Sequence, residues 1–267
     1  GDLFVTLGWE VKGLMDVSYG QTKDFVFKDA VAFLKAKKAL ASEEYRSLDD
    51  ESREKAFTVS GYTSLEVLRE FLDCLGKAVE EGTTKEQFRE DMNRFLEEHG
   101  YEGLNPWKSD NIFRTNMQAA FNAGHYKRMT DKTVLKLRPY WQYKTAGDGE
   151  VRESHARMSD KVYRADDPIW DIWYPPNGFR CRCMVVSLTK RQVENKGLQV
   201  ETKIPYNVDF STGEIKPVYP DKGFSNNPAK SMWQPDMSKL SPQLKKLYQE
   251  RKQQKKEQDK NAPDLSR

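Results

Sequence analysis

The residues best suited to chemistry lie in one stretch, residues 147–183. His155 stands near its start, and Cys181 and Cys183 end it with a single residue between them. Cysteine thiolates and histidine imidazoles are the usual protein ligands of zinc, and a structural site needs four, commonly paired at a spacing of two to four residues. The cysteines here are closer than that, His155 has no nearby partner, and Cys74 is distant. We therefore predict no bound metal and no cofactor.

A second interpretation treats the two cysteines as small buried side chains. In an extended strand, Cys181 and Cys183 face one side and Arg182 faces the other. Arg182 would then hold a carboxylate or backbone carbonyl groups, for which a guanidinium is well shaped. This interpretation makes the stretch a structural element of the fold.

Acidic residues near His155 raise the possibility of an enzyme. Asp148, Glu150, Glu153 and Asp160 are close in sequence, and a histidine with carboxylates can carry out acid–base chemistry. The alternative function is therefore a metal-dependent nuclease or a toxin-like enzyme centred on His155. Against it, the chain has no nucleophile motif, no phosphate-binding glycine loop and no His-Glu-x-x-His pattern. We predict that the protein is not an enzyme.

The aromatic residues of the same stretch allow two interpretations. Trp170, Trp173, Tyr174 and Phe179 are interrupted by prolines. Such rings can stack on bases or sugars, but they more often pin a loop to a core, because Trp and Tyr bury a large area while keeping one polar contact. We favour packing.

The C-terminal part of the chain is basic. Residues 238–260 carry eight Lys or Arg against three Asp or Glu, whereas the whole chain has a net charge of only +3. Basic side chains can neutralise DNA phosphates without reading sequence; a solvated helix or docking on a partner are the alternatives. The candidate DNA contacts are Lys245, Lys246, Arg251, Lys252, Lys255 and Lys256.

Hydrophobic periodicity predicts which elements position these residues. Helices are expected over residues 28–47, where Ser42 opens a second helix as its N-cap, over 63–82, from Thr84 onward, and over 109–130. Ser64 or Thr63 would begin the second helix and Gly82 would end it, while Thr84 would cap the third. Strands are expected over residues 134–143 and 184–188, with residues 199–204 pairing with the latter.

This order of helices followed by strands predicts an α+β fold. We divide the chain into an N-terminal arm (1–25), a helical region (26–131), a small β-containing module (132–208) and an irregular, basic tail (209–267). Hydrophobic residues make up only 37% of the 267 residues, which fits a core with polar extensions. No apolar run approaches the ~20 residues of a membrane span, so we expect no membrane partner. Three cysteines favour a reducing compartment.

Five short pieces carry a resemblance to a known family. They are residues 30–40 (AVAFLKAKKAL), residues 53–61 (REKAFTVSG), Arg114-Thr115-Asn116 with the small residues after it, the 148–183 stretch, and residues 223–228 (GFSNNP). In this order they resemble the Mu F-like family of phage minor head proteins, over roughly residues 26–232. One departure is Ser159-Asp160, where the family tends to have Asp-Gly, which predicts a locally different turn.

The resemblance implies a role in a phage head. It implies a minor capsid protein that binds the portal, with major capsid or scaffolding protein and packaged DNA as further partners, and that assists head assembly and DNA packaging or delivery. It also implies a place in the virion, inside the capsid or at the portal vertex, after assembly in the host cytoplasm. The motif residues would fix the fold: Arg114, Asn116, Asp148, Arg152, His155, Pro175, Pro176, Cys181, Arg182 and Cys183.

Overall fold

The computed structural model describes residues 28–48, 55–208 and 213–232. The predicted arm (1–25) and the six candidate DNA contacts of the tail lie outside these ranges. Along the described chain, the helices and strands follow in the order β1 (Lys38–Ala39), α3 (Ser42–Ser47), β2 (Ala56–Phe57), α5 (Leu65–Glu81), α6 (Lys85–Glu98), α7 (Pro106–Met129), α8 (Lys132–Leu137), β3 (Tyr140–Lys144), α9 (Glu153–Met158), β4 (Val162–Arg164), α10 (Ile169–Ile172), β5 (Met184–Leu188), α11 (Lys190–Asn195), β6 (Tyr206–Val208), β7 (Ile215–Pro217) and α12 (Pro228–Met232).

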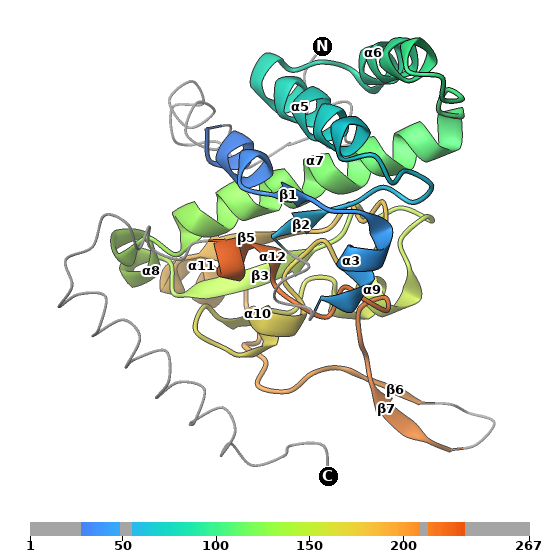
Figure 1. The fold of residues 1–267 in the computed structure, drawn as a ribbon. Coiled ribbons are helices and arrows are strands. Elements are labelled where there is room, and N and C mark those ends of the chain that lie inside the picture. The colour runs from blue at the N-terminus through green and yellow to red at the C-terminus, as the bar shows by residue number, and fades with distance from the viewer. Residues whose placement is uncertain (1–27, 49–54, 209–212, 233–267) are drawn as a thin grey trace, which may run out of the picture. The chain divides into compact units, whose positions relative to one another are not determined.

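Helix α7 is the element against which the others are placed. It begins where Asn105 caps the helix, its side chain accepting from the amide of Lys108 at 2.8 Å, and Pro106 occupies the first turn. Helices α5 and α6 pack on it, and it also contacts β5 and α12. Figure 1 shows α7 between the α5–α6 pair and the strands.

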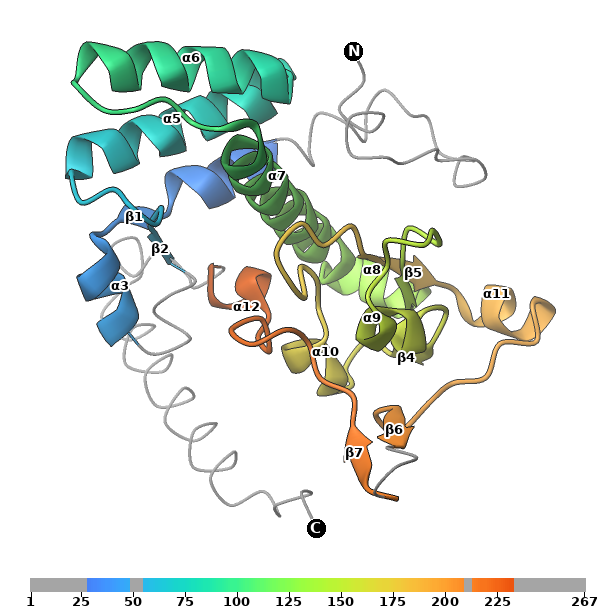
Figure 2. The ribbon, with the colours of Figure 1, turned by 90° about the vertical axis from the view of Figure 1, so that its right-hand side faces the viewer.

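Local signals in the sequence account for α5 and α6. The Ser64 side chain caps α5, and Gly82 ends it in the left-handed conformation with φ 73°, which glycine adopts without a Cβ penalty. Thr84 caps α6 by accepting from the amide of Gln87 at 3.2 Å. These predicted helix boundaries are confirmed. Figure 2 shows the two helices side by side at one end of α7.

A three-stranded antiparallel sheet forms the β part, in the order β4-β3-β5. In the central strand, Trp141 lies opposite Tyr163 of β4 and Ser187 of β5. Two smaller pairs accompany it: β1 with β2, parallel, and β6 with β7, antiparallel. The α+β class and the strand over residues 184–188 are therefore confirmed.

Two of the predicted elements are wrong. Residues 134–137 belong to helix α8 because the Asp131 side chain accepts from the amides of Thr133 and Val134 and starts a helix there. Residues 199–204 do not pair with β5; Val200 makes a parallel bridge to Val162 of β4. The separate helix expected to open at Ser42 is confirmed as α3, although its N-cap is Ala41, and β1 separates it from the helical residues 28–35.

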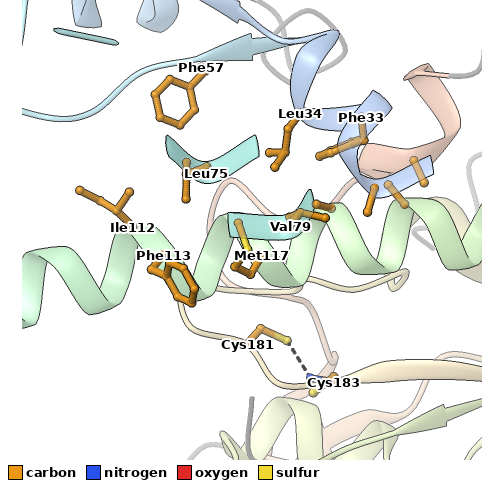
Figure 3. Close-up of a cluster of buried hydrophobic side chains, with 14 of the residues drawn as sticks. Phe33, Leu34, Phe57, Leu75, Val79, Ile112, Phe113, Met117, Cys181 and Cys183 are labelled. Atoms are coloured by element: carbon orange, nitrogen blue, oxygen red, sulfur yellow. Dashed lines mark hydrogen bonds between the residues drawn. The ribbon is translucent and has the colours of Figure 1, made fainter. Parts of the chain in front are cut away.

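The core runs from the helices into the sheet without a break. Figure 3 shows Leu75 and Val79 of α5 near Phe113 and Met117 of α7, with Cys181 and Cys183 on the other side of α7. Trp141 and Tyr143 of β3 belong to the same buried cluster. In the ranges that the structure describes, no helix is long and apolar enough to cross a membrane.

The burial of α5 gives a first prediction. Leu75 is 0% exposed, whereas Leu65 on the same helix is 42% exposed. Leu75→Ala should lower the free energy of unfolding by about 2–5 kcal/mol, because it removes buried contacts and leaves a cavity. Leu65→Ala, the matched control, should change it by less than about 0.5 kcal/mol. Urea denaturation of both variants measures the difference, and equal effects would contradict the packing of α5.

Candidate functional site

The fold brings His155 to two cysteines that follow it 26 and 28 residues later in the sequence. His155 comes from α9, while Cys181 and Cys183 lie in the irregular segment before β5. The Nδ1 atom of His155 is 3.5 Å from the Cys183 sulfur and 3.9 Å from the Cys181 sulfur. Exposures of 2%, 3% and 2% place all three in the interior. His155 has no cysteine or histidine at ligand spacing in the sequence, and the fold brings it to two sulfurs from another segment.

The orientation of the His155 ring is set by its second nitrogen. Nε2 lies 3.2 Å from the carbonyl oxygen of Asn177. A carbonyl only accepts, so Nε2 carries the proton and Nδ1 presents its lone pair to the two sulfurs. Trp173 packs edge-on against the ring, with centroids 6.0 Å apart. The imidazole is held on two sides with its unprotonated nitrogen facing the cysteines.

The two thiols have opposite acidities. The pKa of Cys181 is well below its usual range because its sulfur accepts from the Cys183 thiol, against the opposing effect of burial. The pKa of Cys183 is raised because its proton is held by Cys181 and because it is buried. The backbone amide of Cys183 also donates to the Cys181 sulfur at 3.4 Å, the dashed line in Figure 3. Cys181 is the residue best stabilised as a thiolate.

Polar side chains of α7 hold the segment that carries the cysteines. Gln118 donates to the carbonyl oxygen of Cys183 at 2.8 Å, and Asn122 donates to the same oxygen at 3.3 Å. The Nε2 atom of His125 lies 2.9 Å from the carbonyl oxygen of Val185. Sequence analysis did not single out these three residues. The missed signal is the spacing i, i+4, i+7, which puts all three on one helix face.

The environment of His125 keeps its ring neutral. Burial lowers the pKa of His125 to about 4, opposed by its hydrogen bond to Val185 and assisted by the charge of Arg128. The unfolded chain takes up a proton near pH 6.5, but the folded chain does not until about pH 4. This group therefore contributes stability that is lost as the pH falls between those two values.

Arg182 holds a carboxylate, as the structural interpretation expected. Its guanidinium donates to both oxygens of Asp148, at 2.5 and 2.6 Å, and lies 3.4 Å from Glu150. Arg182 lowers the pKa of Asp148, mainly through this hydrogen bond. A bidentate pair of this kind fixes the relative orientation of both groups. It ties the turn before α9 to the cysteine segment.

Arg152 holds the next part of the stretch. It pairs with Asp221 at 3.0 Å and donates to the carbonyl oxygen of Phe179 at 2.7 Å. Gly178 lies beneath this pair, and a Cβ built there would come within 2.2 Å of an Asp221 carboxylate oxygen. An alanine there would have to displace the Asp221 carboxylate. The adjoining Pro175–Pro176 peptide bond is cis, and both prolines are buried.

Arg114 and Asn116 do not join the histidine–cysteine cluster. Arg114 pairs with Asp110 at 2.7 Å, and Arg180 pairs with the same carboxylate at 2.7 Å. Asn116 donates to the carbonyl oxygen of Ile112 within α7. Asn116 lines a cavity of about 830 Å³ whose wall also includes Trp107, Pro176 and Phe179. Arg114 and Asn116 therefore make their contacts within α7 and beside the cavity.

The aromatic residues mostly pack in the interior. Trp170, Trp173 and Tyr174 are each at most 2% exposed, and their polar atoms are bonded. Tyr174 donates to the carbonyl oxygen of Asn122 at 3.0 Å. Phe179 is the exception, at 57% exposure. The packing interpretation therefore accounts for three of the four rings.

The acidic residues near His155 in sequence are engaged elsewhere. Asp160 pairs with Lys144, and Glu153 pairs with Arg157 at 2.8 Å. Within the described residues, the His/Cys/Asp/Glu group compact enough to share a ligand contains His155, Cys181 and Cys183 and no carboxylate. The geometry thus provides His155 with no carboxylate partner for acid–base chemistry.

Comparisons with known proteins place this arrangement in a family. The family model described as "Phage Mu protein F like protein" matches residues 69–186, which include α7 and the whole His155–Cys183 stretch. This chain is a Mu F-like phage protein. It is 31% identical over 248 residues to protein F of Escherichia phage Mu, which is named for capsid assembly, and the match covers 79% of this chain. It is also 31% identical over 180 residues, 60% of this chain, to the Mu-like prophage FluMu F protein of Haemophilus influenzae.

The likeness is partial on the side of the relatives. This Mu F-like chain spans about half their length, 56% of the phage Mu protein and 43% of the Haemophilus protein. No solved structure matches the chain at a significant level.

Gly178 provides a prediction for this site. Gly178→Ala should cost about 1–3 kcal/mol of stability, because the new methyl group meets Asp221 and forces it away from Arg152. Gly149→Ala is the matched control, since nothing lies within 4 Å of a Cβ there, and it should change stability by less than about 0.5 kcal/mol. Thermal unfolding of both variants tests this, and an unaffected Gly178→Ala would show that the Arg152–Asp221 pair is dispensable.

Proposed function

We propose that this protein is a minor capsid protein of a tailed phage or prophage, which binds the portal and assists head assembly and DNA packaging or delivery. It would act in the virion, inside the capsid or at the portal vertex, after assembly in the host cytoplasm. The observation that carries the proposal is the match of 79% of the chain to a phage Mu protein named for capsid assembly.

The geometry of the site agrees with a structural role. The reactive residues are buried and make contacts within the fold, and the acids that an enzyme would use are paired with basic side chains. On this proposal the protein acts by binding a partner, and no reaction takes place at His155. The contacts within residues 148–183 then serve to hold the β-containing module in one conformation. The metal-dependent nuclease or toxin-like enzyme has no comparable support.

A contact surface is available on the β6–β7 pair. Both views show these strands extending away from the β3–β4–β5 sheet. Tyr206, Ile215 and the nearby Tyr219 are 50%, 64% and 54% exposed. Large apolar side chains gathered on a projecting ribbon favour burial against a partner. We assign this ribbon to the portal contact, with major capsid or scaffolding protein as further partners.

Co-expression with the portal protein of the same genome tests the proposal. Size-exclusion chromatography with light scattering should give a complex of defined stoichiometry. Ile215→Ser should weaken it about tenfold, because burying an isoleucine side chain is worth about 1.5–3 kcal/mol. Leu137→Ser is the matched control, since Leu137 on α8 is also 64% exposed, and it should bind as the unmodified protein does.

Two outcomes would contradict this. A protein that elutes alone beside assembled portal, at micromolar concentrations, would refute portal binding. A normal complex with Ile215→Ser would refute the ribbon as the contact and leave portal binding in place.

The basic tail supports a second part of the proposal, contact with packaged DNA. Replacing Lys245, Lys246, Lys255 and Lys256 by Gln in the full chain should weaken binding to duplex DNA of any sequence. It should also flatten the plot of log affinity against log salt by ~0.9 for each phosphate that the tail no longer neutralises. Fluorescence anisotropy over a salt series measures both quantities.

The control removes the same charge from the body of the protein. It replaces four exposed lysines outside the tail by Gln: Lys132, Lys136, Lys190 and Lys196. Equally weakened binding in the two sets would mean that only overall charge matters, and unchanged binding in the tail set would refute the tail contact.

A further inference from the structure

The buried cluster of His155, Cys181 and Cys183 is more than the packing of the stretch requires. Their possible ligand atoms all lie within 4.8 Å of one another. Around a tetrahedral zinc ion, bonds of ~2.3 Å to sulfur and ~2.0 Å to nitrogen place those ligands about 3.6 Å apart. The observed nitrogen–sulfur distances are 3.5 and 3.9 Å. We propose that His155, Cys181 and Cys183 bind one zinc ion.

The surroundings of His155 are those of a metal ligand. Histidines that bind metals usually donate their other ring N–H to a carbonyl or carboxylate group, which fixes the tautomer. Here Nε2 donates to the carbonyl oxygen of Asn177. The lone pair of Nδ1 therefore points at both sulfurs. Asn177 is itself buried, and its side chain accepts from the Tyr143 hydroxyl at 2.8 Å.

The surroundings of the sulfurs also suit a cation. The Cys183 amide donates to the Cys181 sulfur, which favours a thiolate there. Two neighbouring buried thiolates repel each other unless a positive charge lies between them, and a bound metal supplies that charge while displacing the remaining thiol proton. Two thiolates with an imidazole select a soft or borderline metal such as zinc over magnesium or calcium.

The site has three protein ligands and one tetrahedral position left over. Tyr143, fully buried on β3, interacts with the Cys183 thiol through its hydroxyl. Its proton is donated to Asn177, so its oxygen is the candidate for the fourth ligand. Because the cluster is enclosed by Tyr143 and Trp173, the role of the ion is structural: it links α9 to the segment that leads into β5.

Metal content of the full-length protein tests the proposal. The protein is expressed with zinc in the medium, purified under a phosphine reductant without chelator, and analysed by mass spectrometry of the metals. About one zinc per chain is expected. Cobalt in place of zinc should give thiolate-to-cobalt charge-transfer absorption and the visible bands of a tetrahedral site. Less than about 0.1 metal per chain, with no cobalt spectrum, would overturn the proposal.

Variants separate the site from general thiol binding. Cys183→Ser and His155→Gln should each lose the metal and the cobalt spectrum. Cys74→Ser is the matched control, because Cys74 lies on α5, donates to Glu70 and is not part of the cluster. It should retain one zinc. Retention by both ligand variants, or loss in Cys74→Ser alone, would overturn the assignment.

A test on the unmodified protein avoids variants that fail to fold. Removing zinc with a chelator should lower the Tm, and returning zinc at about 100 times its Kd should raise it by about 5–10 °C. With zinc bound, Cys181 and Cys183 should resist thiol reagents in the folded state until chelator is added. A Tm that does not respond to chelator or to zinc would overturn the proposal.

Discussion

The structure depends on how the buried carbonyl groups of the cysteine segment find donors. Residues 177–183 lack strand pairing, and the residues at both ends of this segment, Asn177 and Cys183, are buried. No ladder therefore satisfies their carbonyl groups, and an unpaired buried carbonyl is costly. Distant groups supply the donors: His155 and the Asp221 amide for Asn177, and Gln118 for Cys183. These bonds reach across from α9 and from α7, so they fix where both helices lie. Hydrophobic contacts then fill the space that the bonds define.

The helices could be predicted from the sequence because their signals are local. Ser64, Gly82 and Thr84 stand within a few residues of the ends they determine, and the apolar spacing between them is unambiguous. Residues 134–137 show the limit of the same reasoning. Their apolar side chains suit a strand, but the cap at Asp131 decides for a helix. Where a short run has both strand-like side chains and a helix cap, the hydrogen bonds of the cap decide the structure, and strand propensity does not include them.

The site could be predicted only in part, because its contacts are distant in sequence. The pairing of Arg182 with a carboxylate follows from side-chain chemistry, although the partner, Asp148, comes from a turn 34 residues earlier. The meeting of His155 with the cysteines does not follow from spacing, since ligand rules describe neighbours along a chain. Gly178 gives no signal in the sequence either, because its backbone angle is not unusual and its contact with Asp221 is made by a residue 43 positions later.

The three cysteines end in different chemical situations. Cys74 donates to Glu70, and burial raises its pKa to about 12, so it stays an unreactive thiol. Cys181 and Cys183 are too near in sequence for an unstrained disulfide, and burial keeps oxidants from them. The two sulfurs can therefore share either a cation or a proton, and the Nδ1 atom of His155 faces both of them. A cation would join α9 to the cysteine segment on one side, while α7 holds the same segment from the other.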